Sequence, residues 1–241
     1  MSEDRQQRIR AVLGLADSTV NIAVRIAMIP VLLCGIYILA DTIGIYADAS
    51  PQRVAIYKPE KLDAASLREI SENCVAWIQI DNTPIDYPIL RAENNTKYLN
   101  KDPYGNYSLS GSIFMDYRNA ADFGDAYTVI YGHHMTGGLM FGALDAYTDE
   151  SYMKDHSSGT LTVGDVEYAI DVYAFFRCDA AHEEVFTPYD GLTPQRLKFF
   201  EDKAWHRNGN PGEKMIALTT CKSPGATDRT VLLANISRKG A

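Results

Sequence analysis

Residues 214–236, KMIALTTCKSPGATDRTVLLANI, contain two strand-like runs separated by a loop. The first run ends at Cys221, and the second begins at Arg229. Both runs are apolar and rich in β-branched residues, as strands in a folded core are. The residues between them include a proline and a glycine, which are typical of a turn. If this loop doubles the chain back, Arg229 lies alongside Cys221, which predicts a thiol beside a guanidinium at one edge of a sheet.

The rest of the C-terminal part of the chain has the same character. Further short strand-like runs, punctuated by turn residues, occupy residues 75–80, 84–90, 111–116, 126–133, 159–163 and 167–178. Residues 62–74 have helical spacing, and a later helix is predicted where Thr193 can cap the first turn and Pro194 can occupy its first position. Many short strands in one unit favour a barrel or a sandwich. The predicted fold class is therefore mainly β, with peripheral helices.

The composition is that of a folded chain with an acidic balance. The chain has 241 residues, of which 46% are hydrophobic, and this is enough for one sizeable domain and an appendage. The formal net charge is −8. An acidic chain is a poor ligand for a phosphate backbone, so we expect no nucleic-acid partner.

Residues 26–47, IAMIPVLLCGIYILADTIGIYA, form an apolar run of the length that a membrane helix needs, about 20 residues. A proline such as Pro30 is tolerated in such a helix. No small-x-small cleavage site directly follows the apolar core, so an uncleaved signal-anchor is favoured over a cleaved signal peptide. The arginines before the run favour a cytoplasmic N-terminus by the positive-inside rule. We therefore expect the bulk of the protein to lie outside the membrane.

The other three cysteines do not form a recognisable metal or redox motif. There is no C-x-x-C, which argues against zinc-ribbon and thioredoxin-like sites. Cys34 lies in the apolar run, and Cys74 and Cys178 are interpreted as small buried apolar residues, with a disulfide between them as the alternative. The chain also lacks H-E-x-x-H and an EF-hand-like loop, so neither a metal nor another cofactor is predicted.

A second reactive group comes from residues 129–135, VIYGHHM, a strand-like run that carries His133 and His134 into a glycine-containing loop. Neighbouring residues of a strand point to opposite faces, so only one of the two histidines can reach Cys221. A thiol nucleophile needs a proton-transfer partner within hydrogen-bond reach. A fixed positive donor such as Arg229 can stabilise the oxyanion of an acyl-transfer intermediate.

Six segments carry a resemblance to a known family. They are IDYPIL (85–90), NNTKYLN (94–100), GSIFMDYRN (111–119), VIYGHHM (129–135), MFGAL (140–144) and the LTTC…R signature (218–229). Through them the chain resembles the class B sortases of Gram-positive bacteria over about residues 65–238. The resemblance implies an eight-stranded β-barrel with a Cys, His and Arg active site. These roles fall on Cys221, on His133, which directly follows the glycine of the motif, and on Arg229.

The resemblance also implies the reaction and its partners. A secreted protein with a C-terminal sorting signal would be cut after a threonine, and its acyl group would pass to Cys221. An amine of a peptidoglycan precursor, or a pilin lysine in some members, would then resolve the thioester. The implied organisation is a cytoplasmic tail (1–24), a transmembrane anchor (25–47), a helical linker (48–74) and an extracellular catalytic barrel (75–241).

Four further residues are candidates for contacts with the donor peptide, each with packing as the alternative. Thr219 and Thr220 flank the nucleophile and could offer hydroxyl or backbone donors. Leu90 could line an apolar groove for the second residue of the signal, which is usually proline in this family. Tyr189 lies in the insert before the cysteine strand, a segment that often walls the groove in class B members.

Three other functions are compatible with the sequence. The first is a pilin-polymerising enzyme of the same class, which differs only in its acceptor amine. The second is a secreted cysteine protease, which would use water in place of an amine. The third is an inactive anchored binding module, against which the intact Cys221, His133 and Arg229 argue.

Overall fold

A computed structural model describes residues 3–50, 56, 58–221 and 228–240, apart from the side chains of Asp4, Asp48 and Cys221. The predicted loop at residues 222–227 therefore lies outside the described residues. The chain divides into two compact units, one ending at Tyr46 and one beginning at Ala47.

The N-terminal unit is a single helix, α1 (Glu3–Asp48), which continues through Pro30. Within the described residues, one helix is long and apolar enough to cross a bilayer, and it spans Arg5–Ala47. The residues of its most apolar stretch are exposed. The helix contains the predicted anchor segment and continues beyond it toward the N-terminus. Its length and apolar composition are consistent with a membrane anchor or a signal sequence.

The second unit contains all eight strands that the sequence predicts, most of them within two residues of the predicted ends. They are β1 (Cys74–Ile80), β2 (Asp86–Leu90), β3 (Ile113–Met115), β4 (Tyr127–Tyr131), β7 (Ser158–Val163), β8 (Val166–Asp179), β10 (Met215–Cys221) and β11 (Asp228–Arg238). Strand β4 ends at Tyr131, two residues before His133.

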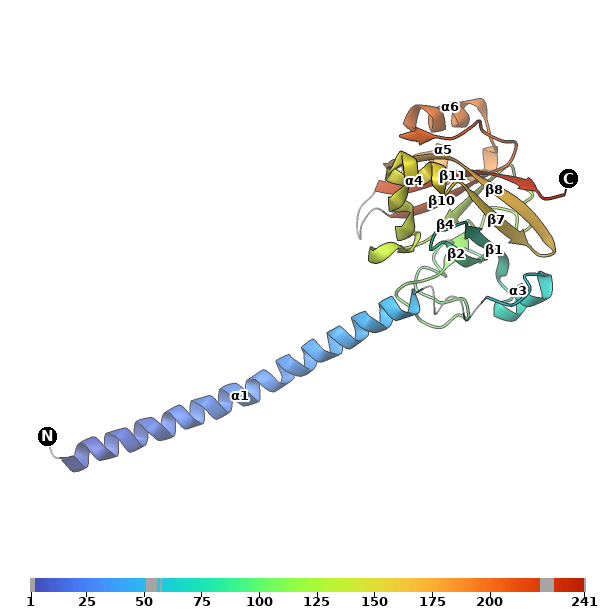
Figure 1. Ribbon diagram of the computed structural model, residues 1–241. Helices are drawn as coiled ribbons and strands as arrows, with labels where there is room; N and C mark the ends of the chain where they lie inside the picture. The colour runs from blue at the N-terminus through green and yellow to red at the C-terminus, as the bar shows by residue number, and fades with distance from the viewer. Residues whose placement is uncertain (1–2, 51–55, 57, 222–227, 241) are drawn as a thin grey trace. The chain divides into compact units, whose positions relative to one another are not determined.

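These strands close into a barrel (Figure 1). Their order is β11-β10-β4-β3-β2-β1-β7-β8, and β8 pairs with β11 to complete the ring. The β2–β3 and β4–β10 pairs are parallel and the remaining pairs are antiparallel. Closure removes the exposed strand edges that an open sheet would have. The predicted fold class, an eight-stranded sortase-type barrel with peripheral helices and an N-terminal apolar helix, is confirmed.

Shorter elements fill the connections. The helices are α3 (Ala64–Ile70), α4 (Glu150–Asp155), α5 (Glu183–Phe186) and α6 (Pro194–Lys203), with 3-10 turns η1 (Thr136–Gly138), η2 (Phe141–Thr148) and η3 (Pro188–Asp190). Thr193 caps α6 by accepting from the Arg196 amide, as predicted. Three two-residue strands that the sequence did not predict are β5 (His134–Met135), β6 (Leu139–Met140) and β9 (His206–Arg207).

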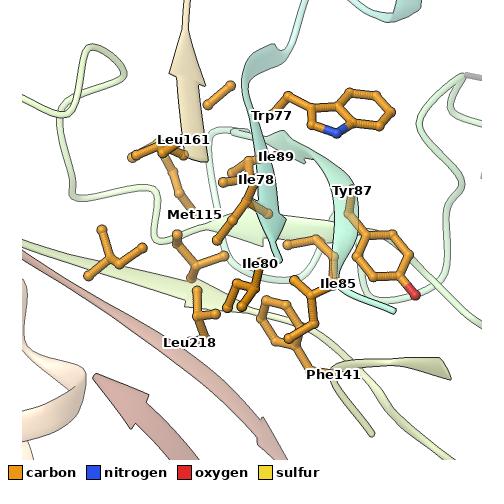
Figure 2. Close-up of a cluster of buried hydrophobic side chains, with 14 of the residues drawn as sticks. Trp77, Ile78, Ile80, Ile85, Tyr87, Ile89, Met115, Phe141, Leu161 and Leu218 are labelled. Atoms are coloured by element: carbon orange, nitrogen blue, oxygen red, sulfur yellow. The ribbon is translucent and has the colours of Figure 1, made fainter. Parts of the chain in front are cut away.

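Apolar side chains form two cores on the two faces of the sheet. The barrel interior holds residues such as Ile78, Ile89 and Leu218 (Figure 2). A second cluster lies on the outer face, where Val185 of α5 and Phe200 of α6 pack against the strands. Residues of β10 alternate between these cores, with Ile216 and Leu218 inside and Met215 and Ala217 outside. Since the strand continues in register, Thr219 shares the outer face with Ala217.

Candidate active site

Strand register brings three of the predicted residues to one end of the barrel. Cys221 is the last residue of β10 and pairs directly with Arg229 of β11. On its other side β10 runs parallel to β4, with Thr219 opposite Tyr131. The Gly132 amide continues this ladder by donating to the Thr219 carbonyl at 3.1 Å. His133 is the next residue, so it leaves β4 beside the end of the strand that carries Cys221.

A cavity of about 320 Å³ opens at this place. Its described lining comes from the strand ends, the β2–β3 loop and the segment after β8, and consists of Asn95, Leu99, Phe114, Tyr131, Gly132, His133, Ala180, Phe186, Thr219, Thr220 and Arg229. His133 and Arg229, which are 96 positions apart in the sequence, thus border one cavity. The Cys221 side chain is outside the described part, but its backbone lies between these two residues in the sheet.

The imidazole of His133 is oriented by a backbone carbonyl. Its Nε2 lies 2.6 Å from the carbonyl oxygen of Leu99. A carbonyl oxygen only accepts, so Nε2 carries the proton that it donates, and Nδ1 is the nitrogen left for proton transfer. The same loop therefore lines the cavity and determines the histidine tautomer.

His134, the first residue of β5, faces a different environment from His133. Its Nε2 donates to Asp145 Oδ2 at 2.7 Å, and Asp145 also pairs with Arg177 at 3.2 Å. His134 lines a separate cavity, which it shares with Asp145 and the glycines of η1. The structure thus brings His133, and not His134, to the cavity beside Cys221.

Gly111 packs closely against both groups of the His133–Leu99 hydrogen bond. It has a φ of +59°, and a Cβ placed on it would lie 2.7 Å from the carbonyl oxygens of Tyr98 and Leu99 and 2.9 Å from Cδ2 of His133. Real Cβ atoms do not approach neighbours this closely. Only glycine therefore fits both the backbone conformation and the space at this position.

The two barrel cysteines other than Cys221 are unsuited to nucleophilic chemistry. Cys74 and Cys178 are buried and are free thiols, so the alternative of a disulfide between them is not what the structure shows. Burial raises the pKa of each of these thiols to about 12. At neutral pH both are therefore protonated, and a thiol in this state is a poor nucleophile.

The four predicted contact residues fall in different places. Thr219 and Thr220 line the cavity, although the Thr219 hydroxyl is engaged with the Ile130 carbonyl at 3.2 Å. Leu90 has no exposed surface and belongs to the barrel core, so the structure does not bring it to the cavity. Tyr189 is 69% exposed and borders a small neighbouring pocket with Arg118.

Several residues of the cavity were not predicted from the sequence. Asn95, Leu99, Tyr131 and Phe186 line it alongside the predicted residues. Tyr131 could have been predicted, because the strand expected at residues 126–133 puts it two positions before His133, on the same face. The other three lie on connecting segments with no periodicity from which to predict their direction.

The described residues offer no arrangement for a metal ion. In residues 3–50, 58–221 and 228–240, no group of three or more His, Cys, Asp or Glu side chains could hold one. His133 and His134 face different cavities, and Asp145 is bonded to His134 and Arg177. The described lining of the cavity supplies the imidazole of His133 and the guanidinium of Arg229.

Comparison with known proteins places this arrangement in a family. The profile of the sortase domain matches residues 78–237. Sortase B of Listeria monocytogenes is 30% identical over 160 residues, which cover 64% of this chain and 65% of that protein. Sortase B of Staphylococcus aureus is 27% identical over 71% of this chain and 73% of its own length. The crystal structure of a Streptococcus pyogenes class B sortase involved in pilus biogenesis superposes with a TM-score of 0.66 at 33% identity, covering 72% of this chain and 97% of that one.

Proposed function

Because the chain belongs to the sortase family, a family of cysteine transpeptidases, and resembles its class B members, we propose that it is a membrane-anchored transpeptidase acting on secreted proteins. Its donor is a protein with a C-terminal sorting signal, which is cleaved after a threonine. Its acceptor is an amine of a peptidoglycan precursor. Cys221 is the nucleophile, His133 the proton-transfer group and Arg229 the oxyanion stabiliser.

One observation carries this proposal. The pairing of β10 with β11 and β4 puts Cys221 opposite Arg229 and next to the strand that delivers His133, with a cavity at their common edge. Strands β10 and β11 hold Cys221 and Arg229, and His133 follows β4 directly after the Gly132–Thr219 hydrogen bond. Such rigid support is what a catalytic constellation requires. Cys74 and Cys178, which are buried with raised pKa values, offer no competing nucleophile.

The chemistry follows from the roles of the three residues. The Cys221 thiol transfers its proton to Nδ1 of His133 and attacks the carbonyl carbon of the threonine. The resulting oxyanion is stabilised by the guanidinium of Arg229. His133 returns the proton to the departing amine, which leaves a thioester on Cys221. An incoming amine attacks the thioester, His133 accepts its proton, and the thiol is regenerated with the new amide.

The N-terminal unit supports the proposed location. Helix α1 is long and apolar enough to span a bilayer, and the arginines before its apolar core favour a cytoplasmic N-terminus. We propose residues 25–47 as the span, with residues 1–24 cytoplasmic, residues 48–74 as a linker and residues 75–241 as the extracellular catalytic unit. A lipid-linked precursor would then be available at the same membrane.

A pilin lysine is the second candidate acceptor. The specific observation in its favour is the likeness to a class B sortase that is involved in pilus biogenesis. Both acceptors are primary amines, so the same active site serves either of them. They can be separated by offering the acyl-enzyme a precursor-like oligoglycine or a purified pilin domain and identifying which product forms.

The proposal is tested with the full chain in detergent and a quenched fluorescent peptide library that has proline at the second signal position and a scissile bond after threonine. Cleavage should occur in the wild-type protein and be abolished in Cys221→Ala. Added amine should raise turnover and appear in the product, whereas a cysteine protease would show no gain. An inactive binding module would bind peptides without cleaving any of them, and this result would refute the proposal.

A further inference from the structure

Asp116, the residue after β3, is a carboxylate in an unusual position. Its side chain has no solvent exposure. A buried carboxylate is costly unless all its oxygens are paired. Asp116 meets this requirement with five hydrogen bonds to Asn95, Arg118 and Tyr131. None of these bonds involves Cys221, His133 or Arg229.

The partners of Asp116 form the walls of the cavity. Its Oδ2 accepts from Asn95 Nδ2 at 2.9 Å and from the Tyr131 hydroxyl at 2.9 Å, and both residues line the cavity. The Asn95 side chain also accepts from the Tyr117 amide at 2.9 Å, so its orientation is doubly determined. Two walls, from the β2–β3 loop and from β4, are thus bonded to one oxygen atom.

A third wall is connected through Arg118. Its Nε and Nη2 bind the two oxygens of Asp116 at 2.8 and 2.7 Å, in the bidentate geometry that is strongest for this pair. The same Nη2 donates to the carbonyl oxygen of Phe186, the last residue of α5, which lines the cavity from the opposite segment. Asp116 therefore joins the β2–β3 loop, β4 and α5.

The reacting groups are held by other contacts. His133 is oriented by the Leu99 carbonyl, and its strand by the Gly132–Thr219 bond. Arg229 is positioned by the β10–β11 ladder. The loop segment at Leu99 has its own bonds, for example from the Ser112 amide to the Tyr98 carbonyl at 3.0 Å. Loss of the Asp116 carboxylate therefore loosens the walls of the cavity without releasing the reacting groups.

We propose that Asp116 is a positioning residue that fixes the shape of the donor-peptide groove. The inference rests on the proposed function, since it assumes that the cavity holds an extended peptide. In Asp116→Asn an amide replaces one carboxylate oxygen and cannot accept from all three partners. The charge that holds Arg118 is also lost. The peptide must then order the walls itself, and this cost appears in binding rather than in chemistry.

The first measurement is steady-state kinetics with the cleaved library peptide at a fixed amine concentration. Asp116→Asn should raise KM about tenfold and leave kcat within about threefold, which is the pattern of lost ground-state binding. The Kd of the same peptide for Cys221→Ala should rise by the same factor when Asp116→Asn is added. Alkylation of Cys221 by a small uncharged thiol reagent should keep its wild-type rate.

The matched control is Asp86→Asn. The Asp86 carboxylate is bonded to Trp77 and Lys58 and does not border the cavity, so this variant should leave KM unchanged.

Tyr131→Phe provides a second, milder test if Asp116→Asn does not fold. It keeps the ring at the cavity and removes only the hydroxyl that donates to Asp116, so KM should rise severalfold. Where Asp116→Asn does fold, the same change in that background should add little, because the hydroxyl has lost its charged acceptor. A full additional effect there would mean that the hydroxyl contacts the peptide directly, and the inference would be wrong.

The outcomes separate the inference from the proposed function. If the wild-type chain cleaves no library peptide, the proposed function fails and the inference fails with it. If the wild type cleaves but KM and Kd are unchanged in folded Asp116→Asn, only the inference fails. It also fails if kcat, thiol alkylation and Tm fall together at constant KM, since Asp116 would then be a general structural residue. If Asp116→Asn does not fold, an unchanged KM in Tyr131→Phe also overturns the inference.

Discussion

Replacement of Gly111 by alanine tests whether the His133 geometry depends on the close packing beneath it. The new Cβ would lie 2.7 Å from the Leu99 carbonyl oxygen, which accepts from His133, and 2.9 Å from the imidazole ring. Two of its neighbours are backbone atoms that cannot rotate away, so the loop, the histidine or both must shift. A shift of about 1 Å in a reacting group can cost on the order of 100-fold in rate.

A matched control, Gly105→Ala, separates the two parts of the stability cost of Gly111→Ala, the backbone strain and the steric overlap. Gly111 has a φ of +59° and Gly105 a φ of +88°, so alanine at either site pays the left-handed backbone cost of about 1–2 kcal/mol. A Cβ at Gly105 would have no neighbour within 4 Å, whereas at Gly111 overpacking adds about 1–3 kcal/mol. For a domain of this size each kcal/mol lowers Tm by about 2–4 °C. Gly111→Ala should therefore melt several degrees below Gly105→Ala.

The assay compares kcat/KM, Tm and the rate of Cys221 alkylation in the two variants. Gly105→Ala should lose some stability and keep wild-type kcat/KM. Gly111→Ala should lose about 100-fold in kcat/KM at a temperature where both variants are folded, because its steric contact involves His133 and the acceptor of its hydrogen bond. Equal kcat/KM in the two variants would refute the argument that Gly111 supports the catalytic histidine.

Three further predictions concern individual side chains. His133→Ala should lose several orders of magnitude in kcat/KM and His134→Ala about tenfold or less, and the reverse ranking would show that His134 faces the thiol. Arg229→Ala should turn over about 10²–10³ times more slowly while a small thiol reagent still labels Cys221 at the normal rate, and Arg229→Lys should recover only part of the lost turnover. If Arg229→Ala instead lowers both Tm and activity, and Arg229→Lys restores both, then Arg229 is a structural residue. Burial alone would raise the pKa of Asp116, but its hydrogen bonds to Arg118 and its other partners outweigh burial and lower it. The stabilisation from the carboxylate is therefore complete above the unfolded-state pKa of about 3.9 and is lost as the pH falls through the folded-state value. The difference in unfolding free energy between wild type and Asp116→Asn should shrink below about pH 4, and a difference that grows there would contradict this.

The strands were predictable because their apolar residues are dense and their turns are well marked. β10 and β11 pair with Cys221 opposite Arg229, the neighbourhood that the sequence predicts if the chain doubles back after Cys221. The two-residue strands β5, β6 and β9 were not predicted, because two residues carry no periodicity. Helix α6 ends at Lys203, and the chain then pairs with β8 at His206. Helical propensity cannot predict this end, because it depends on a tertiary contact.

The walls of the cavity were harder to predict than its reacting groups. Leu90 was expected to line a groove, but residues 87–90 of β2 are all buried, so this strand has no polar face from which its orientation could be read. The partners of Asp116 include Asn95 and Tyr131, which lie 21 and 15 positions away in the sequence. No local spacing rule connects residues so far apart. Only the closed barrel brings them together.

The central claim is that Cys221 carries the acyl intermediate. The full chain is mixed with a cleavable sorting-signal peptide in the absence of added amine, quenched in acid, digested and analysed by mass spectrometry. We expect the acyl adduct on Cys221 alone, its loss on addition of an amine, and its absence from Cys221→Ala, while Cys74→Ala and Cys178→Ala still form it. An adduct on another residue, or peptide cleavage that survives in Cys221→Ala, would contradict the account.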